Sequence, residues 1–213
     1  MLSSRRNLAL ACSLSALAGY VDGIGFLHLG GLFVSFMSGN STQLGVNLAQ
    51  GRWPNAIQAL VVIVLFVAGT AAGSLIARSR WRYRQCWVLL IEALLLAGAA
   101  LGHAIGLPTF AVVPMVLAMG LENAIFQVRG GPGLGLTYVT GALVKVGQLI
   151  AAALTGGPRW AWLPNLLLWA ALVAGALCGA RAYLVVNLAA IWAAAAGALA
   201  LSGMVFATAK PQD

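Results

Sequence analysis

Three acidic residues lie inside stretches that are apolar enough to cross a membrane, and they constrain this chain more than any other feature. Asp22, Glu92 and Glu122 are each flanked by long apolar runs, and the remaining acidic residue is Asp213 at the C-terminus. A carboxyl group at the centre of a bilayer costs about 2.5–3.5 kcal/mol on the insertion scale unless it is neutralised, paired or exposed to water. Three such groups in 213 residues predict a polytopic membrane protein with a polar site or pathway inside its helix bundle.

The composition excludes a soluble globular domain. Hydrophobic residues make up 62% of the chain and charged residues 8%, whereas about 25% of the residues of a typical soluble domain are charged. A net charge of +8 would suggest nucleic acid as the partner of a soluble protein. Here the cations flank apolar segments, where such residues orient helices and meet anionic lipid headgroups. We therefore expect one all-α membrane domain over 1–213, with membrane lipids and no nucleic acid as partners.

The sequence lacks the patterns of common catalytic and metal centres. It contains no Gly-x-Ser-x-Gly elbow, no Walker motif and no haem-attachment motif. Cys12, Cys86 and Cys178 lie in apolar segments without metal-ligand spacing. We expect no enzymatic activity, no cofactor and no bound metal.

Eight segments are candidates for membrane spans, since about 20 apolar residues cross the bilayer core. They cover 7–27, 32–50, 56–77, 86–104, 109–127, 134–154, 161–180 and 183–206. The second and the sixth differ from the rest because they contain clusters of Ser, Thr, Asn or Gln, and the sixth also contains Lys145. Polar, discontinuous segments of this kind are typical of transporters. We expect 32–50 and 134–154 to be broken or re-entrant, which leaves about six full spans.

The two halves of the chain echo each other in sequence. Gly19-Tyr20-Val21-Asp22-Gly23-Ile24 matches Gly120-Leu121-Glu122-Asn123-Ala124-Ile125 at an offset of 101 residues. Ser38-Gly39 matches Thr140-Gly141 at an offset of 102, and Val67-Ala68-Gly69 matches Val173-Ala174-Gly175 at an offset of 106. Glycine and alanine recur by chance in membrane helices, but the order and the near-constant offset of the matches favour a tandem duplication. The two four-segment units would cover 7–104 and 109–206.

The placement of basic residues separates two topologies. If all eight segments span and the N-terminus is inside, five basic residues lie inside and six outside. If 32–50 and 134–154 enter and leave on the same side, nine lie inside and only Arg52 and Arg181 lie outside, with Lys145 in the membrane. The second topology obeys the positive-inside rule, and its three full spans per unit would make the repeats inverted. A third alternative is that another segment, such as the glycine-rich end of the first, is the broken one.

The run Ser38-Gly39-Asn40-Ser41-Thr42 is the most site-like feature of the chain. Gly39 permits backbone geometry that helices avoid, and Ser, Asn and Thr are good N-caps for a half-helix that restarts inside the membrane. The N-terminus of such a half-helix offers unpaired N–H groups and a partial positive charge to an anionic or carbonyl-bearing ligand. The alternative is that the small polar residues only allow close helix packing, which explains five of them in succession less well.

The acidic residues and Lys145 are candidate coupling groups. A carboxyl inside a membrane can take up and release a proton, as a proton-coupled transporter requires, and Asp22 and Glu122 are candidates for this role. The repeat counterpart of Asp22 is Asn123, and an equal alternative for Asp22 is a structural carboxyl that hydrogen-bonds the Ser/Thr segment or pairs with Lys145. Lys145 itself is a candidate substrate counter-ion, a salt-bridge partner of a carboxyl, or a snorkelling side chain. For Glu92 we expect pairing or coupling.

Three motifs connect the chain with a known family. They are Gly19-Tyr20-Val21-Asp22, then Phe33 followed after three residues by Met37-Ser38-Gly39-Asn40, and later Gly120-Leu121-Glu122-Asn123 with Thr140-Gly141. These resemble the Gly-Tyr-x-Asp start, the Phe-x-x-x-Met-[Ser/Thr]-Gly-Asn core and the Gly-x-x-Asn…Thr-Gly echo of the YoaK-like family of bacterial integral membrane proteins. The resemblance covers about 20–210. It implies a multi-pass protein of the bacterial inner membrane with about six spans, and it supplies no substrate.

Together these observations predict a small secondary transporter or permease of unknown substrate. Arg5-Arg6 before an apolar run predicts an uncleaved first helix with a cytoplasmic N-terminus. The small-molecule or ion site would lie between Ser38–Thr42 and Thr140–Lys145, with proton coupling through Asp22 and Glu122. The competing interpretation is a non-transporting scaffold, or a lipid- or protein-interacting protein, whose polar residues only hold helices together. A homodimer stays open under either interpretation, because a membrane domain this small encloses a cavity more readily as a dimer.

Overall fold

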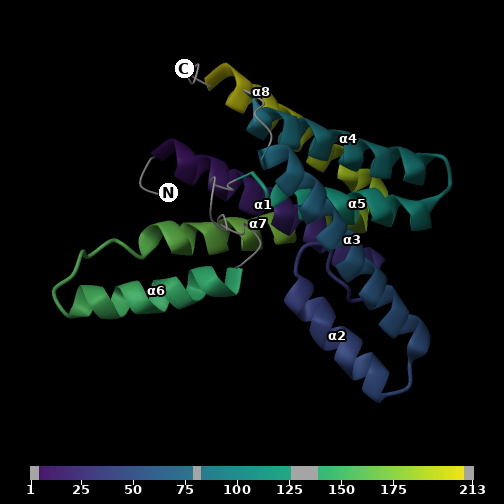
Figure 1. The fold of residues 1–213 in the computed structure, drawn as a ribbon, viewed down its shortest axis with the longest axis horizontal. Coiled ribbons are helices and arrows are strands. Elements are labelled where there is room, and N and C mark those ends of the chain that lie inside the picture. Colours follow the sequence, from purple (N-terminus) through teal and green to yellow (C-terminus); the bar gives the residue numbers. More distant parts are fainter. Residues whose placement is uncertain (1–4, 79–82, 126–138, 209–213) are drawn as a thin grey trace.

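The computed structural model describes residues 5–78, 83–125 and 139–208, which form helices joined by short non-helical segments, and no strand occurs among them. The helices are α1 (Arg5–His28), α2 (Met37–Ala49), α3 (Trp53–Arg78), α4 (Arg84–Ala104), α5 (Pro108–Glu122), α6 (Val139–Leu154), α7 (Leu163–Val186), the short 3₁₀ helix η1 (Asn187–Ala190) and α8 (Ile191–Thr208). In Figure 1, α4, α5 and α8 lie together, while α2 with the first part of α3 and α6 with the first part of α7 form two arms that extend from the centre. The all-α prediction is confirmed.

Several helices are suited to a bilayer. Four stretches are long and apolar enough to cross one, namely Arg6–His28, Trp53–Arg78, Arg84–Ala104 and Leu163–Thr208. The last has 46 residues and contains α7, η1 and α8, and Asn187, the residue between α7 and the rest of this stretch, has a positive φ of 52°. Two shorter apolar helices cover Phe110–Glu122 and Val139–Leu154. Helices of this length and composition are those of an integral membrane protein.

The two polar segments form short helices in the part of the chain that is described, and the apolar α5, with 15 residues, is also short. Residues 29–36 are not helical, and α2 has 13 residues, which corresponds to a length of about 20 Å against a hydrocarbon core of about 30 Å. The helix α6 has 16 residues, or about 24 Å. Positions 134–138 of the predicted segment 134–154 lie outside the described residues.

Glycines bring α1 into direct backbone contact with α7. A Cβ atom added to Gly19 would lie 2.1 Å from the carbonyl oxygen of Leu172, and one added to Gly23 would lie 2.5 Å from that of Ala176. No side chain fits at such distances, so only glycine allows the two backbones to approach this closely. Because the partners on both helices advance together along the chain, α1 and α7 run parallel.

The helices α3 and α5 pack in the same way. A Cβ atom added to Gly69 would lie 2.3 Å from the carbonyl oxygen of Leu117, and one added to Gly73 would lie 2.7 Å from that of Leu121. These partners also advance together, so α3 and α5 run parallel. Each of these two glycine-lined pairs thus packs a helix of the first half against a helix of the second half.

The contacts in these two helix pairs correspond residue by residue. The residue numbers of equivalent contacts differ by 101 between α1 and α5 and by 106 between α3 and α7. These are also the offsets of the sequence echo. The matching contacts are Gly19–Leu172 and Gly120–Phe66, Gly175–Ala16 and Gly69–Leu117, and Gly179–Tyr20 and Gly73–Leu121.

The helices α4 and α8 lie side by side in opposite directions. The Ser202 hydroxyl donates a hydrogen bond to the carbonyl oxygen of Cys86 at 3.0 Å, and the ring centroids of Tyr83 and Phe206 are 5.1 Å apart. Both contacts join the start of α4 to the end of α8. The two helices are therefore antiparallel, as Figure 1 also shows.

Candidate functional site

Glu92 and Glu122 place a pair of carboxyl groups in the core of the bundle. Glu92 lies in the middle of α4 and Glu122 at the end of α5, and both side chains are 0% exposed. Their four carboxyl oxygens are buried and have no hydrogen-bond partner among the described residues. The two groups are close enough to interact electrostatically, and Glu122 is also within electrostatic range of Asp22 on α1.

The surroundings of this pair are apolar. Leu89 and Leu96, one turn before and after Glu92 on α4, are fully buried, as is Met119 one turn before Glu122 on α5. Burying an unpaired carboxylate in such surroundings costs far more than a protein's stability margin. The pair is therefore either protonated or bound to a cation in this arrangement. No group of three or more metal-binding side chains occurs in the described part of the chain.

Asp22 differs from the two glutamates because its carboxyl group is fully engaged. Its Oδ1 accepts hydrogen bonds from the backbone N–H groups of Val34 at 2.8 Å and Ser35 at 2.7 Å, and its Oδ2 accepts one from the Ser35 hydroxyl at 2.5 Å. These bonds hold the non-helical residues 29–36 against α1. These bonds agree with the alternative in which Asp22 hydrogen-bonds the Ser/Thr segment, with Ser35 as the partner.

Asn40, on α2, also hydrogen-bonds the backbone of the non-helical residues 29–36. Its Oδ1 accepts the backbone N–H of Phe33 at 2.9 Å, and its Nδ2 donates to the Phe33 carbonyl at 2.7 Å. Gly39 lies against aromatic rings, since a Cβ atom added there would lie 2.7 Å from Cδ1 of Phe36. The residues of the Phe33…Gly39-Asn40 motif therefore shape the loop and position the start of α2.

The hydrogen bonds of Asp22 lead to a prediction about stability. We expect Asp22→Ala to lower the free energy of unfolding by about 2 kcal/mol, because it leaves the buried N–H groups of Val34 and Ser35 without an acceptor. Asp22→Asn keeps an oxygen for these two groups and an N–H for the Ser35 hydroxyl, so it should stay within about 1 kcal/mol of the wild type. Thermal unfolding in detergent measures the stability of both variants relative to the wild type. Equal losses in the two variants would show that the charge matters more than the hydrogen bonds.

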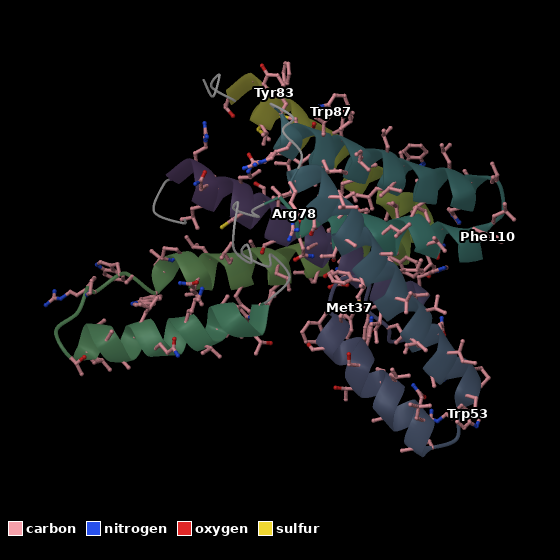
Figure 2. All side chains as sticks on the ribbon, viewed as in Figure 1. Met37, Trp53, Arg78, Tyr83, Trp87 and Phe110 are labelled. Atoms are coloured by element: carbon pink, nitrogen blue, oxygen red, sulfur yellow. The ribbon has the colours of Figure 1, made fainter. Side chains whose placement is uncertain are left out.

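The hydroxyl groups of α2 bond to their own helix. Ser41 donates to the carbonyl oxygen of Met37 at 2.8 Å, and Thr42 donates to that of Ser38 at 3.2 Å. Ser38, Ser41 and Thr42 are exposed. In Figure 2, Met37 lies near the centre of the molecule and Trp53, which follows α2, lies at the tip of the α2–α3 arm. The polar run therefore starts α2 near the centre, and two of its hydroxyl groups are used in bonds within α2.

The candidate residues of the second half lie on α6. Thr140 and Lys145 are exposed there, and Gly141 is half-buried. The helix α2 packs against α3 and α6 packs against α7, and Figure 1 shows the two short helices on different arms of the molecule. The structure does not bring Ser38–Thr42 and Thr140–Lys145 together.

Lys145 does not hydrogen-bond Glu122 or Asp22, the two carboxyl groups that were its candidate partners. The oxygens of Glu122 have no hydrogen-bond partner among the described residues, and those of Asp22 accept the three bonds from Val34 and Ser35. Asn123, the counterpart of Asp22, donates its Nδ2 to the carbonyl oxygen of Met119 at 2.9 Å. The structure thus groups Asp22, Glu122 and Glu92 in the core and leaves Lys145 outside this group.

Comparison with known proteins places the chain in a family. The family described as "Protein of unknown function (DUF1275)" matches residues 10–204. The chain belongs to the DUF1275 family. It is 40% identical over 201 residues to the UPF0700 transmembrane protein RA0705 of Rhizobium meliloti (strain 1021), with 94% of this chain and 86% of that relative covered. It is 26% identical over 156 residues to the UPF0700 transmembrane protein YoaK of Bacillus subtilis (strain 168), with 70% of this chain and 69% of YoaK covered. No solved structure matches.

These relatives confirm the resemblance to YoaK and the membrane character of this DUF1275 protein. They carry no activity or substrate in their names, so the function has to be argued from the geometry. Several residues of the motifs that carried the resemblance, Asp22, Phe33, Gly39 and Asn40, meet at the loop before α2.

The sequence singled out Glu122 in this DUF1275 protein but did not pair it with Glu92. A signal for the pairing was available. The helices α4 and α5 are joined by residues 105–107, and in an antiparallel hairpin two residues at similar distances from the turn lie at a similar depth. Glu92 is 12 residues before the end of α4, and Glu122 is 14 residues after the start of α5.

Proposed function

We propose that this DUF1275 protein is a small proton-coupled secondary transporter or permease of the bacterial inner membrane, in which Glu92 and Glu122 carry the coupled proton. The observation that carries the proposal is the pair of fully buried carboxyl groups on α4 and α5, which have no hydrogen-bond partner among the described residues. Ionisable groups inside a membrane domain are expensive to keep and usually mark an ion or proton pathway. A structural role would pair each carboxyl with a donor, as the structure does for Asp22.

We further propose that the two halves are inverted repeats over 7–104 and 109–206. The corresponding glycine contacts of α1 with α7 and of α5 with α3 support this, because a duplicated unit would place equivalent residues in equivalent interfaces. The antiparallel crossing of α4 and α8 supports inversion. If the two units were related by an axis along the membrane normal, these equivalent helices would be parallel.

The same crossing supports six full spans. If all eight helices spanned the membrane, α4 and α8 would run in the same direction, which the contact between Cys86 and Ser202 opposes. Further contacts gather the start of α1, the end of α3, the start of α4 and the end of α8 at one end of the bundle, since Arg6 donates to the Thr208 carbonyl and Arg84 to the Ala77 carbonyl. The basic residues at this end favour a cytoplasmic location for it, with the N-terminus inside.

In this topology α2 is a re-entrant half-helix. It starts next to the loop that Asp22 holds, well inside the end of α1, and returns to the outer side at Gln50–Arg52. A half-helix that begins at membrane depth is a common element of transporter sites.

Labelling of single cysteines in a cysteine-free background tests the topology. We expect a cysteine at Arg52 to react with a membrane-impermeant maleimide from the outside, and cysteines at Arg84 and Arg159 to react only from the inside, because six spans place them there. A protein with eight spans would instead show Arg52 and Arg159 on the inside and Arg84 on the outside. That pattern would contradict both the re-entrant α2 and the inverted repeats.

Transport is tested with purified protein in liposomes on a solid-supported membrane. Under an inward proton gradient, a panel of organic anions, amino acids and sugars is applied in turn. We expect one class to give a transient current that requires the gradient. A folded protein that gives no current with any class, at any gradient, would favour the second function.

That second function is a non-transporting membrane scaffold. The contacts of Asp22 and Asn40 favour it, because both side chains only hold a loop to its neighbours, and the hydroxyl groups of Ser41 and Thr42 only bond to their own helix. The scaffold does not explain why Glu92 and Glu122 are buried with no hydrogen-bond partner among the described residues.

A further inference from the structure

An apolar groove lies between α1, α7 and α8. Its volume is about 520 Å³. The lining is almost entirely apolar and consists mainly of small side chains, among them Ala16, Cys178, Ala193, Gly197 and Ala200, together with the longer Met204. Several of these, including Cys178, Ala193 and Met204, are exposed, so the groove is open along one side of the bundle.

The small residues of α8 create this groove. In the other half of the molecule, the corresponding place lies between α5, α3 and α4, and Trp192 and Ala198 of α8 match Trp87 and Ala93 of α4 at an offset of 105. At this offset the groove residues Ala194, Gly197 and Ala200 correspond to Leu89, Glu92 and Leu95. Leu89 and Glu92 are fully buried, and α4 packs closely against α5, whereas α8 makes much looser contact with α1. The groove therefore exists because α8 carries small residues where α4 carries larger ones at the equivalent positions.

The dimensions of the groove suit a single hydrocarbon chain. Along α8 it runs from Ala193 to Met204, about 16 Å at 1.5 Å per residue. The space open to atom centres, about 520 Å³, has a cross-section of about 30 Å² over this length, which corresponds to a groove about 9 Å wide once the radii of the atoms are added. An α-helix with its side chains is about 10–12 Å across, so a helix from a second copy is too thick to enter. An extended acyl chain is thin enough.

An acyl chain alone would gain little selectivity from this groove, because the surrounding bilayer is just as apolar. Selectivity has to come from the headgroup. Ser13 and Met204 line the groove towards the end of the bundle where α1 starts and α8 ends, two turns after Arg6 on α1 and one turn before Thr208 on α8. Arg6 is exposed and donates one N–H to the Thr208 carbonyl at 3.1 Å. A guanidinium group has five N–H donors, so it can bind a phosphate group at the same time.

We propose that the groove between α1, α7 and α8 binds one acyl chain of an anionic phospholipid, whose phosphate is bound by Arg6. In the proposed topology this lipid belongs to the cytoplasmic leaflet, which is where anionic headgroups meet basic residues. The lipid site does not depend on the proton-coupled transport proposed above, since it uses neither Glu92 nor Glu122.

Photocrosslinking tests the site. The purified full chain is placed in lipid nanodiscs with a small fraction of phosphatidylglycerol carrying a diazirine on one acyl chain, and crosslinked peptides are identified by mass spectrometry. We expect crosslinks in the groove segments of α1 and α8, and about fivefold fewer with phosphatidylcholine carrying the same chain. Arg6→Gln should lower the phosphatidylglycerol yield about fivefold, while Arg159→Gln, another exposed arginine, should not.

Two leucine substitutions on α8 give a matched comparison. A Cβ atom added to Gly197 would lie 3.7 Å from Cδ1 of Leu17, an ordinary contact, so Gly197→Leu can fold and fills the groove. Gly203 is outside the lining and a Cβ atom added there meets nothing within 4 Å. We expect Gly197→Leu to reduce the groove crosslinks to background and Gly203→Leu to leave them unchanged. If Gly197→Leu does not fold, Ala200→Leu replaces it.

Either of two results would overturn the proposal. Equal yields from phosphatidylglycerol and phosphatidylcholine would show that Arg6 selects no headgroup. Unchanged groove crosslinks in folded Gly197→Leu or Ala200→Leu would show that no acyl chain occupies the groove.

Discussion

We expect Gly175→Ala to destabilise the protein by about 3 kcal/mol, at the upper end of the cost of overpacking. A Cβ atom at Gly175 would lie 2.0 Å from the carbonyl oxygen of Ala16. That atom is backbone, and it cannot move away without separating α1 from α7. The helices α1 and α7 form the closest packing in the molecule, so their separation would loosen the whole bundle. Thermal unfolding in detergent, followed by tryptophan fluorescence, measures the loss.

Two matched variants make this prediction specific. Gly203→Ala should stabilise the protein by about 0.5–1 kcal/mol, because alanine is the better helix former and its Cβ atom meets nothing within 4 Å. Gly69→Ala should cost about as much as Gly175→Ala, because its Cβ atom would lie 2.3 Å from the carbonyl oxygen of Leu117. A wild-type stability for Gly175→Ala would show that α1 and α7 do not pack as described. A wild-type stability for Gly69→Ala alone would count against the equivalence of the two halves.

The second large effect is expected from the buried carboxyl pair. We expect Glu92→Gln and Glu122→Gln each to reduce proton-driven transport to background, because glutamine cannot take up or release a proton. Glutamine has nearly the same size as glutamate and carries no charge that burial would penalise. Both variants should therefore keep a thermal stability close to that of the wild type. The measurement is the transient current on a solid-supported membrane with the substrate class that the wild type transports.

Asp22→Asn is the matched control for this experiment. It also removes a carboxyl group, one that lies within electrostatic range of Glu122, but the hydrogen bonds of Asp22 show that it holds a loop. We expect this variant to keep proton-driven transport. Full transport in folded Glu92→Gln and Glu122→Gln would contradict the proposed role of the pair. A loss in Asp22→Asn as well would extend the coupling to all three carboxyl groups.

Sequence reasoning found those parts of the fold that depend on local properties. Hydropathy identified the apolar helices, because a bilayer requires long apolar stretches wherever they occur in the fold. The polar run of 32–50 correctly indicated a segment that is not one span-length helix, and Gly39 and Asn40 lie where the non-helical loop gives way to α2. The echo between Gly19 and Gly120 reflects a requirement of close helix packing, since both positions leave no room for a Cβ atom.

The candidate site was harder to read from the sequence. Asp22 and Asn40 looked like ligand-binding groups because polar residues in membranes often are, yet both are used to hold the backbone of residues 33–35. Ser38–Thr42 and Thr140–Lys145 looked like two halves of one site because they are equivalent in sequence. They lie on different arms in the structure, and equivalence in sequence does not place two segments next to each other in space.

The sequence by itself determined that this protein is an all-α membrane protein, where its apolar helices lie and which positions had to be small. These properties depend on the solvent around a segment and on the space at a single residue, and both can be read locally. Only the tertiary structure decided that Glu92 and Glu122 form a pair without partners, that Asp22 and Asn40 hold a loop, and that small residues of α8 leave a groove. Each of these depends on which helices pack together, and packing between distant segments is a property of the whole bundle rather than of any one helix.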